Sequence, residues 1–311
     1  MIKKNLFNIC FTLVFFGLFS FIIFSYYEDI ARALYNHDVF PTDETFEIEA
    51  CQQWTNSTRN FDMAPDNKAE NVTVLMYHRI IEDEEIDDIH LEEDGELVST
   101  VLLKSQFEEQ MQLLKKEGYT TLTLKELEQY INNDLDVPKK SLVLTFDDGF
   151  KDNAMEVAPI LRKLDFNAVS FVITAAVHKY DYPFKAGEFQ YFSVDDIHNS
   201  CDVFEFESHT YNFHKRMEDN TPYLTGKSDE KVKEDLENSL FNLDGKRQAF
   251  ASPYGAYDEE NIQLFKDLGF SMAFTVNPDV VYPGTPMYEI PRKEVFPDDT
   301  MEDFKEKIGL H

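Results

Sequence analysis

The chain has 311 residues, of which 43% are hydrophobic and 14% aromatic, so it is long enough for a large hydrophobic core. With three cysteines and 11 glycines it is neither a small disulfide-framed scaffold nor a fibrous or disordered chain. Its 59 acidic and 29 basic residues give a net charge of −30, which repels phosphate backbones, so we expect no nucleic-acid partner.

Residues 6–24 form an uncharged, mostly apolar run that follows the cations Lys3 and Lys4. As a helix this run is about 28 Å long, close to the thickness of a bilayer's hydrocarbon core. The positive-inside rule places its start in the cytoplasm. We therefore predict that residues 1–27 are a single-pass anchor in the cell membrane with an extracellular domain. The small residues Ala31 and Ala33 leave open the alternative of a protein secreted after signal cleavage.

Residues 28–71 are polar, acidic and without periodicity, which predicts an extracellular stalk. Cys51 and Cys201 lie far apart in the sequence, so a disulfide in an oxidising compartment and two free thiols remain equal alternatives. No pattern in the sequence identifies a protein partner.

From residue 72 to residue 311 the pattern predicts one α/β domain with a parallel sheet, either open or closed into a barrel. Capping boxes at Ser105 with Glu108 and at Thr123 with Glu126 predict the starts of the first two helices. The expected strands are residues 72–76, 142–146, 168–173, 203–206, 248–251 and 271–276, and the expected helices are residues 105–117, 124–131, 153–164, 231–240 and 259–268.

The residues with the most chemistry follow the predicted strands directly. Asp147 and Asp148 directly follow the predicted strand over residues 142–146. His209 comes shortly after residues 203–206, and Tyr254 comes shortly after residues 248–251. Because the carboxyl ends of parallel strands form the functional edge of such folds, we expect these side chains to lie together.

Two adjacent acids suit divided roles, because neighbouring side chains leave an extended chain in opposite directions. His209 and His214 would lie about 140° apart on a helix, so joint metal binding by them requires a loop. Together with one carboxylate they make a facial metal site with open positions. Taken singly, the acids also fit an ordinary turn, and the histidines fit two unrelated loop residues.

Three segments, in this order, resemble the first three motifs of the polysaccharide deacetylase family, also called the NodB homology domain or carbohydrate esterase family 4. They are Thr145-Phe-Asp-Asp-Gly149, the two-histidine segment, and Ser252-Pro-Tyr-Gly255. The resemblance covers about residues 72–309. It implies a distorted (β/α) barrel, here preceded by one transmembrane helix.

Two departures from the family pattern resemble its subgroup of poly-β-1,6-N-acetylglucosamine N-deacetylases of the intercellular adhesion protein B type. The histidines are five residues apart instead of four, and Ala251 stands where the third motif usually has Arg. Residues 76–79, 119–126 and 290–299 resemble the same subgroup.

The resemblance implies a role for each matching residue. Asp148, His209 and His214 are the expected ligands of one divalent metal ion, with zinc first and iron, cobalt or nickel as alternatives. Asp147 is the expected general base, and the backbone N–H of Tyr254 is the expected donor to the oxyanion.

Two further roles are less constrained by the motifs. Many family members use a late histidine as general acid, but after His214 this chain has only His311, so His78 is the predicted acid. A histidine satisfied by ordinary polar contacts is the alternative. Arg292 either orients Asp147 or is a surface residue.

The sequence therefore predicts an extracellular, metal-dependent N-deacetylase of a polysaccharide of N-acetylglucosamine. The preferred substrate is poly-β-1,6-N-acetylglucosamine, a biofilm exopolysaccharide. The alternatives are a deacetylase of peptidoglycan or of a chitin-like β-1,4 polymer, and a catalytically silent glycan-binding surface module. An aromatic stretch over residues 180–192 either stacks on sugars or packs over the barrel mouth.

Overall fold

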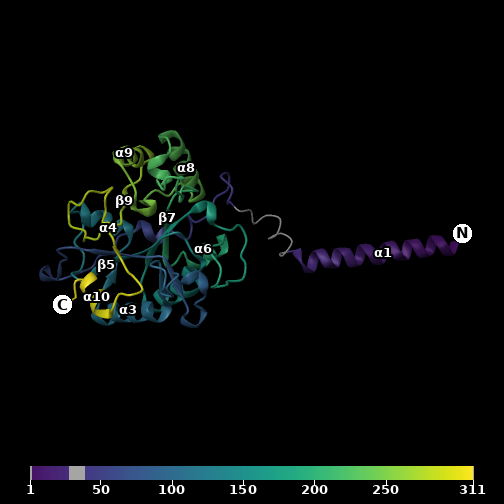
Figure 1. Cartoon of the computed structure of the whole chain (residues 1–311), viewed down its shortest axis with the longest axis horizontal. Helices are drawn as coiled ribbons and strands as arrows, with labels where there is room; N and C mark the ends of the chain where they lie inside the picture. The colour runs from purple at the N-terminus through teal and green to yellow at the C-terminus, as the bar shows by residue number, and fades with distance from the viewer. Residues whose placement is uncertain (1, 28–38, 311) are drawn as a thin grey trace.

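The computed structural model describes residues 2–27 and 39–310 (Figure 1). A parallel sheet of eight strands forms its centre, in the order β10-β1-β5-β6-β7-β8-β9 with β4 beside β5. A second sheet pairs β2, Arg79–Ile81, with β3, Val101–Leu103. The main strands are β1 Thr73–Tyr77, β4 Thr120–Thr121, β5 Ser141–Phe146, β6 Ala168–Val172, β7 Phe204–Ser208, β8 Ala249–Ala251, β9 Met272–Phe274 and β10 Lys293–Glu294.

One segment closes this sheet. Ile290 pairs with Phe274 of β9, and three residues further along Lys293 pairs with Leu75 of β1. The segment therefore spans the gap between the first and last strands and curls the sheet into a distorted barrel. This confirms the predicted fold class.

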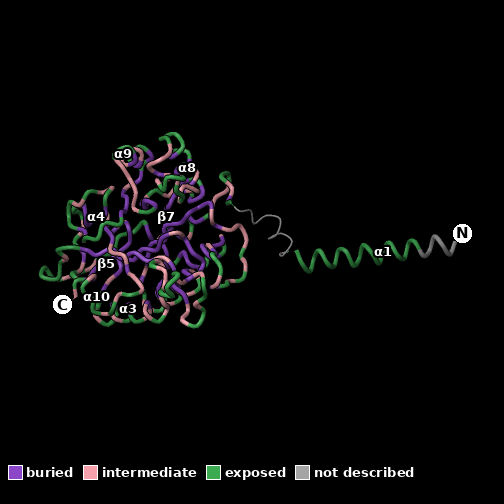
Figure 2. Tube along the Cα trace, in the orientation of Figure 1, coloured by how far each residue is buried: buried purple, intermediate pink, exposed green. Residues whose placement is uncertain are grey.

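Helices surround the central strands (Figure 1). One core lies between the sheet and α3, Lys104–Glu117, and α5, Ala158–Leu164. A second core fills the barrel interior with α4, Leu124–Ile131. The buried strands form the inside of the domain in Figure 2. The other helices of the domain are α6 Val194–Ser200, α7 Tyr223–Gly226, α8 Asp229–Asn242, α9 Glu259–Leu268 and α10 Met301–Lys307.

One of the two predicted capping boxes is confirmed. Thr123 caps α4 and Glu126 returns the hydrogen bond. The box at Ser105 is wrong, because α3 begins at Lys104 and the carboxylate of Asp83 accepts the hydrogen bond from the Ser105 N–H at 3.1 Å. A carboxylate from another segment thus replaces the local cap. The helix predicted over residues 153–164 begins as a π turn, Asn153–Val157, before α5.

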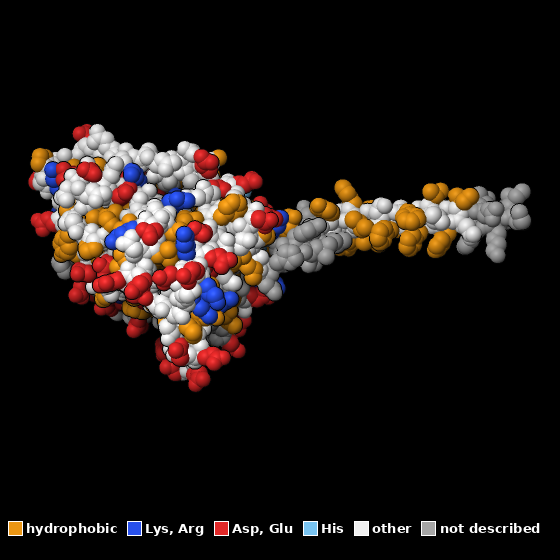
Figure 3. Space-filling model, turned by 90° about the horizontal axis from the view of Figure 1, so that it is seen from above, with side chains coloured by type: hydrophobic (Ala, Val, Ile, Leu, Met, Phe, Trp, Pro, Cys, Tyr) orange, Lys and Arg blue, Asp and Glu red, His pale blue; other side chains and the backbone are white. Residues whose placement is uncertain are grey.

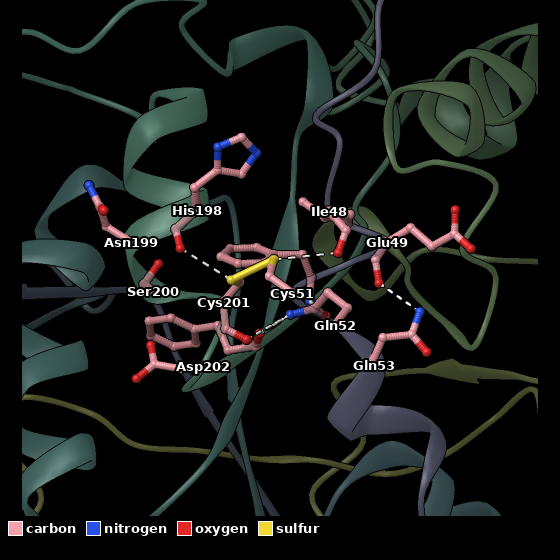
Figure 4. The surroundings of a disulfide bond; sticks show 12 residues. Ile48, Glu49, Cys51, Gln52, Gln53, His198, Asn199, Ser200, Cys201 and Asp202 are labelled. Carbon is pink, nitrogen blue, oxygen red and sulfur yellow. Dashed lines mark hydrogen bonds between the residues drawn. A yellow bond between two sulfur atoms is a disulfide. The ribbon is translucent and has the colours of Figure 1, made fainter.

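Residues 39–59, which we call the belt, pack on the domain, whereas the sequence predicted a stalk over this region. Phe40, Phe46 and Ile48 are buried in the outer core. Cys51 forms a disulfide with Cys201, the residue after α6 (Figure 4). Hydrophobic burial and this crosslink hold a segment that has no helical or strand periodicity, so its sequence gave no sign of order.

The belt also fills an opening in the sheet. β7 and β8 pair at one position only, Ser208 with Phe250. The side chain of Gln52 enters beside β7, donates to the Phe204 carbonyl at 2.7 Å and accepts from the Phe206 N–H at 3.2 Å. An amide side chain therefore satisfies the backbone groups that a neighbouring strand would otherwise satisfy.

Near this opening lie three buried carboxylates that we call the floor: Glu126, Glu205 and Glu207. Glu205 accepts a hydrogen bond from the first N–H of α4 at 2.9 Å, and Glu207 lies 3.3 Å from the ammonium of Lys246. Burial raises the pKa of Glu205 to about 8.

The N-terminal helix α1, Ile2–Ser25, contains a window from Asn8 to Ser25 that is long and apolar enough to cross a membrane, with a mean hydropathy of 2.1. A signal sequence has the same properties. The cleavage-site residues Ala31 and Ala33 lie outside the described residues. Figure 3 shows apolar side chains along α1 and many acidic side chains on the visible face of the domain.

Candidate active site

Two acids at the end of β5 form the centre of the site. Asp148 adopts a left-handed φ of 72°, which an aspartate accepts better than most residues. Gly149 follows at φ 79°, and a Cβ there would stand 2.9 Å from the Val172 side chain. The two carboxylates therefore have different partners because of a tight left-handed turn, and not because of the extended chain that the sequence suggested.

The Asp148 carboxylate meets the two histidines. Its Oδ1 atom lies 3.5 Å from Nε2 of His209 and 3.2 Å from Nε2 of His214. One potential ligand atom from each of the three residues lies within 4.8 Å of the others. His209 directly follows β7, and the loop after it carries His214 back to the same point, so the loop arrangement that the five-residue spacing requires is present.

This group fits a divalent metal ion. The buried Oδ1 of Asp148 has no hydrogen-bond partner among the described residues. Nδ1 of His209 lies 2.8 Å from the Ala251 carbonyl, which leaves Nε2 free to face Asp148. Burial lowers the pKa of His209 to about 3 and also lowers that of His214, so both imidazoles are neutral at pH 7, as metal binding requires.

The Asp147 carboxylate meets Arg292 instead. Both side chains are buried, and two guanidinium nitrogens donate to the two carboxylate oxygens at 2.6 and 2.8 Å. A third nitrogen of Arg292 donates to the Thr275 carbonyl at 2.9 Å. Burial alone would raise the pKa of Asp147, but the charge and hydrogen bonds of Arg292 hold it well below its usual range. Arg292 is therefore a buried partner of Asp147 and not a surface residue.

His78 lies at the end of β1, beside the same centre. Its side chain is 15% exposed, and its Nδ1 lies 3.9 Å from a carboxylate oxygen of Glu294. Its positive form would stabilise the charged forms of both Asp147 and Asp148. His78 is thus a partly exposed histidine next to both acids, where a general acid would stand.

Tyr254 completes the site from the end of β8. It has a left-handed φ of 59°, which is costly for an aromatic residue and marks a position set by its surroundings. Its ring lies 4.5 Å from the ring of His214. The next residue, Gly255, leaves room for Val276, since a Cβ there would stand 2.3 Å from that side chain.

Most of these residues lie in one stretch of the chain. Residues 134–273, which include both acids, both histidines and Tyr254, match the family described as polysaccharide deacetylase. This chain carries a polysaccharide deacetylase (NodB) domain. His78 and Arg292 lie outside the matched stretch, directly after β1 and directly before β10, the strands that complete the barrel of the deacetylase.

Relatives and solved structures agree with this assignment. The poly-beta-1,6-N-acetyl-D-glucosamine N-deacetylase of Staphylococcus aureus strain MSSA476 is 26% identical over an alignment of 257 residues, and the alignment covers 78% of this chain and 85% of the relative. The structure of IcaB from Ammonifex degensii has a TM-score of 0.64 at 23% identity and covers 78% of this chain and 97% of that one.

A third comparison gives the same fold. The Streptococcus pyogenes deacetylase PplD, solved in complex with acetate, has a TM-score of 0.64 at 23% identity and covers 76% of this chain and 98% of that one. The family match and the Staphylococcus aureus relative identify the chain as a hydrolytic N-deacetylase, and the two solved structures show the shared fold.

The aromatic side chains of residues 180–192 differ in how far they are buried. Tyr191 stacks on Phe150 at 5.1 Å, and the guanidinium of the buried Arg79 lies 5.3 Å from the rings of both Phe150 and Phe189. Phe189 is 63% exposed. The stretch therefore packs beside the deacetylase site and leaves one aromatic side chain in solvent.

Sequence reasoning missed two charged residues at the site. Glu294 faces His78, and the guanidinium carbon of Arg216 lies 4.0 Å from the centre of the Tyr254 ring. Arg216 stands two residues after His214, so its nearness to a predicted ligand was an available signal. Glu294 offered none, because its place depends on β10 pairing with β1.

Proposed function

We propose that this deacetylase removes acetyl groups from poly-β-1,6-N-acetylglucosamine outside the cell, with one divalent metal ion held by Asp148, His209 and His214. The observation that carries the proposal is that the two adjacent acids at the end of β5, Asp147 and Asp148, contact different groups. One acid faces two neutral imidazoles, and the adjacent acid is held ionised by Arg292. The printed function of the Staphylococcus aureus relative supports the choice of polymer.

Such a metal ion supplies a Lewis acid that polarises the acetamide carbonyl and lowers the pKa of water. Asp147 is ionised at neutral pH and accepts the proton of the attacking water. A carboxylate with so low a pKa is a weak base, so the assignment requires that this water be strongly acidified. The backbone N–H of Tyr254 donates to the developing oxyanion.

The leaving amine needs a proton before the carbon–nitrogen bond breaks. His78 is partly exposed, lies beside both acids and has its Nδ1 3.9 Å from a carboxylate oxygen of Glu294. It is therefore our choice for the general acid. The products are a free amine on the sugar and acetate.

An extracellular location agrees with the disulfide between Cys51 and Cys201, since such bonds persist in oxidising compartments. We propose that α1 anchors the deacetylase in the cell membrane. N-terminal sequencing of the chain from washed membranes tests this: an intact start supports the anchor, and a start after Ala33 would establish cleavage instead.

Acetate release by the purified full chain in detergent tests the reaction. The substrates are β-1,6 and β-1,4 oligomers of N-acetylglucosamine, each with added zinc or with a chelator. We expect chelator-sensitive release from the β-1,6 oligomers. Release from β-1,4 oligomers alone would move the substrate to peptidoglycan or a chitin-like polymer. Release that is indifferent to chelator and metal would contradict the metal site.

A further inference from the structure

A deacetylase that acts on a polymer also binds chains in which some sugars have already been deacetylated. Each turnover converts a neutral acetamide and water into acetate and an amine, and this amine is protonated at neutral or mildly acidic pH. The sugars on either side of the next acetamide are therefore neutral or cationic, depending on earlier turnovers. Charges that flank the catalytic centre act on this difference.

A cation flanks the centre on the His214 side. Arg216 is exposed and lies over the Tyr254 ring, which in turn stands against the ring of His214. One of its nitrogens donates to the Asn220 carbonyl, which holds the side chain in place without neutralising it. Across residues 39–310 no carboxylate oxygen within 4.0 Å pairs with Arg216. An ammonium group bound here would be repelled.

A carboxylate flanks the centre on the His78 side. The side chain of Glu294 is 25% exposed, and within the described chain the one basic side chain inside 4.0 Å of its carboxylate is that of His78. It also lines a cleft of about 520 Å³, which is in the usual range for a small-ligand site. The cleft opens where β9 and β10 end, so it adjoins the catalytic centre. Its other walls include Val276, Pro278 and Phe296.

Two of the other charged side chains of this cleft form an ion pair, and two contact backbone groups. Lys307 forms an ion pair with Asp299, and Lys293 donates to the Lys307 carbonyl. Asp303 accepts hydrogen bonds at the start of α10. Glu294 is thus the carboxylate of this cleft that stands nearest the catalytic groups and has no lysine or arginine partner.

We propose that the deacetylase reads the state of the neighbouring sugars: it accepts a deacetylated, cationic sugar in the cleft beside Glu294 and rejects one beside Arg216. The inference rests on the proposed function, because it requires an amino-sugar polymer. Its consequence is directional. Deacetylation would spread along the polymer from one side of an existing amine and would be suppressed on the other side.

The test uses the full chain with zinc at pH 6 and β-1,6 oligomers with one acetylated target sugar. A single glucosamine stands on either the reducing or the non-reducing side of the target, and all other sugars are acetylated. The readout is kcat/KM for acetate release, divided by that for the fully acetylated oligomer. This ratio cancels any change in overall activity. We expect one isomer to react roughly threefold to tenfold faster than the other, as one partly screened charge allows.

Two variants assign the effect. Arg216→Gln should raise the ratio of the disfavoured isomer by roughly threefold to tenfold, and Glu294→Gln should lower that of the favoured isomer by a similar factor. The controls are Lys233→Gln and Glu302→Gln, which change exposed charges of α8 and α10. In 0.5 M salt the discrimination should shrink.

Equal ratios for the two isomers, or variants no different from the controls, would overturn this inference and leave the deacetylase function intact. No acetate from the fully acetylated oligomer would instead overturn the proposed substrate, and this inference with it.

Discussion

At the catalytic end of the barrel the buried carboxylate of Asp147 faces Arg292, whereas at the floor the buried carboxylate of Glu205 faces two other acids. Asp147 has two charged hydrogen bonds from a guanidinium, and its pKa is lowered. Glu205 has one hydrogen bond from a backbone N–H, and its pKa is raised to about 8. Burial acts in the same direction on both, so the partner decides the protonation state.

The comparison separates a group built for chemistry from one built for packing. A proton acceptor must be ionised at working pH, and Arg292 secures this for Asp147 at the cost of burying two charges. The floor has no such demand: the charge of Lys246 only partly offsets burial at Glu205, and no arginine or lysine forms an ion pair with this carboxylate among the described residues. The two regions should therefore respond oppositely to substitution and to pH.

The largest effect is expected when either of the two adjacent acids, Asp147 or Asp148, is replaced by asparagine. Asp148→Asn should abolish zinc binding and lower acetate release by more than about 10³-fold, since a ligand is lost. Asp147→Asn should keep zinc and lower kcat by roughly 10²- to 10⁴-fold, since the proton acceptor is lost. Metal content by elemental analysis beside activity separates the two, and a fully active Asp147→Asn would refute the division of labour.

Arg292→Lys tests the partner that distinguishes the two regions. A lysine cannot replace the bidentate contact, so the pKa of Asp147 should rise and a larger fraction should be protonated in acid. We expect roughly tenfold lower kcat/KM at pH 6 and an acidic limb of the pH profile displaced to higher pH. An activity loss that is equal at every pH would assign Arg292 a purely structural role.

The belt that covers the floor should contribute strongly to stability. The disulfide closes a loop with a sequence separation of 150 residues. Replacing Cys51 and Cys201 by serine should lower the free energy of unfolding by roughly 2–4 kcal/mol. Urea unfolding measures this, with reductant as the control: it should destabilise the natural chain and leave the double variant unchanged.

A smaller, pH-dependent effect is expected at the floor. Because the folded pKa of Glu205 lies above its unfolded value of 4.5, its contribution to stability is fully present below pH 4.5 and is lost as the pH rises towards 8. Glu205→Gln keeps the acceptor for the Leu124 N–H and cannot ionise. It should match the natural chain at pH 4.5 and exceed it at pH 8 by roughly 1–3 kcal/mol.

Thermal melts at the two pH values provide the measurement, and Glu237→Gln on the exposed face of α8 is the matched control. A gain that is the same at both pH values would mean that Glu205 does not titrate in this range.

The barrel was predictable because its strands are short, wholly buried runs bounded by turns, and because Thr123 with Glu126 marks a helix start by local chemistry alone. The order of the belt was not predictable. Phe40, Phe46 and Ile48 are buried by contact with distant elements, and no periodicity of their own records this. The start of α3 was predicted wrongly for the same reason, since the carboxylate that caps it comes from Asp83 in another segment.

At the site, the acids and histidines were predictable because each follows a strand whose end is fixed by the fold. Arg292 was left open between the interior and the surface, and only the closure of the barrel between β9 and β1 buries it against Asp147. Glu294 reaches His78 through the same closure. Residues contributed by the closing segment therefore need the three-dimensional structure, whereas those that follow the central strands do not.

The crosslink also determines how the domain bears a mechanical load. A pull on the chain before Val39 can peel away residues 39–50, whose contacts are individually weak. At Cys51 the tension passes through the covalent bond into the residues after α6. Gln52 and the opening between β7 and β8 then lie beyond the point where the load enters. Tension applied to the chain before residue 39 would therefore strip residues 39–50 and leave the barrel closed.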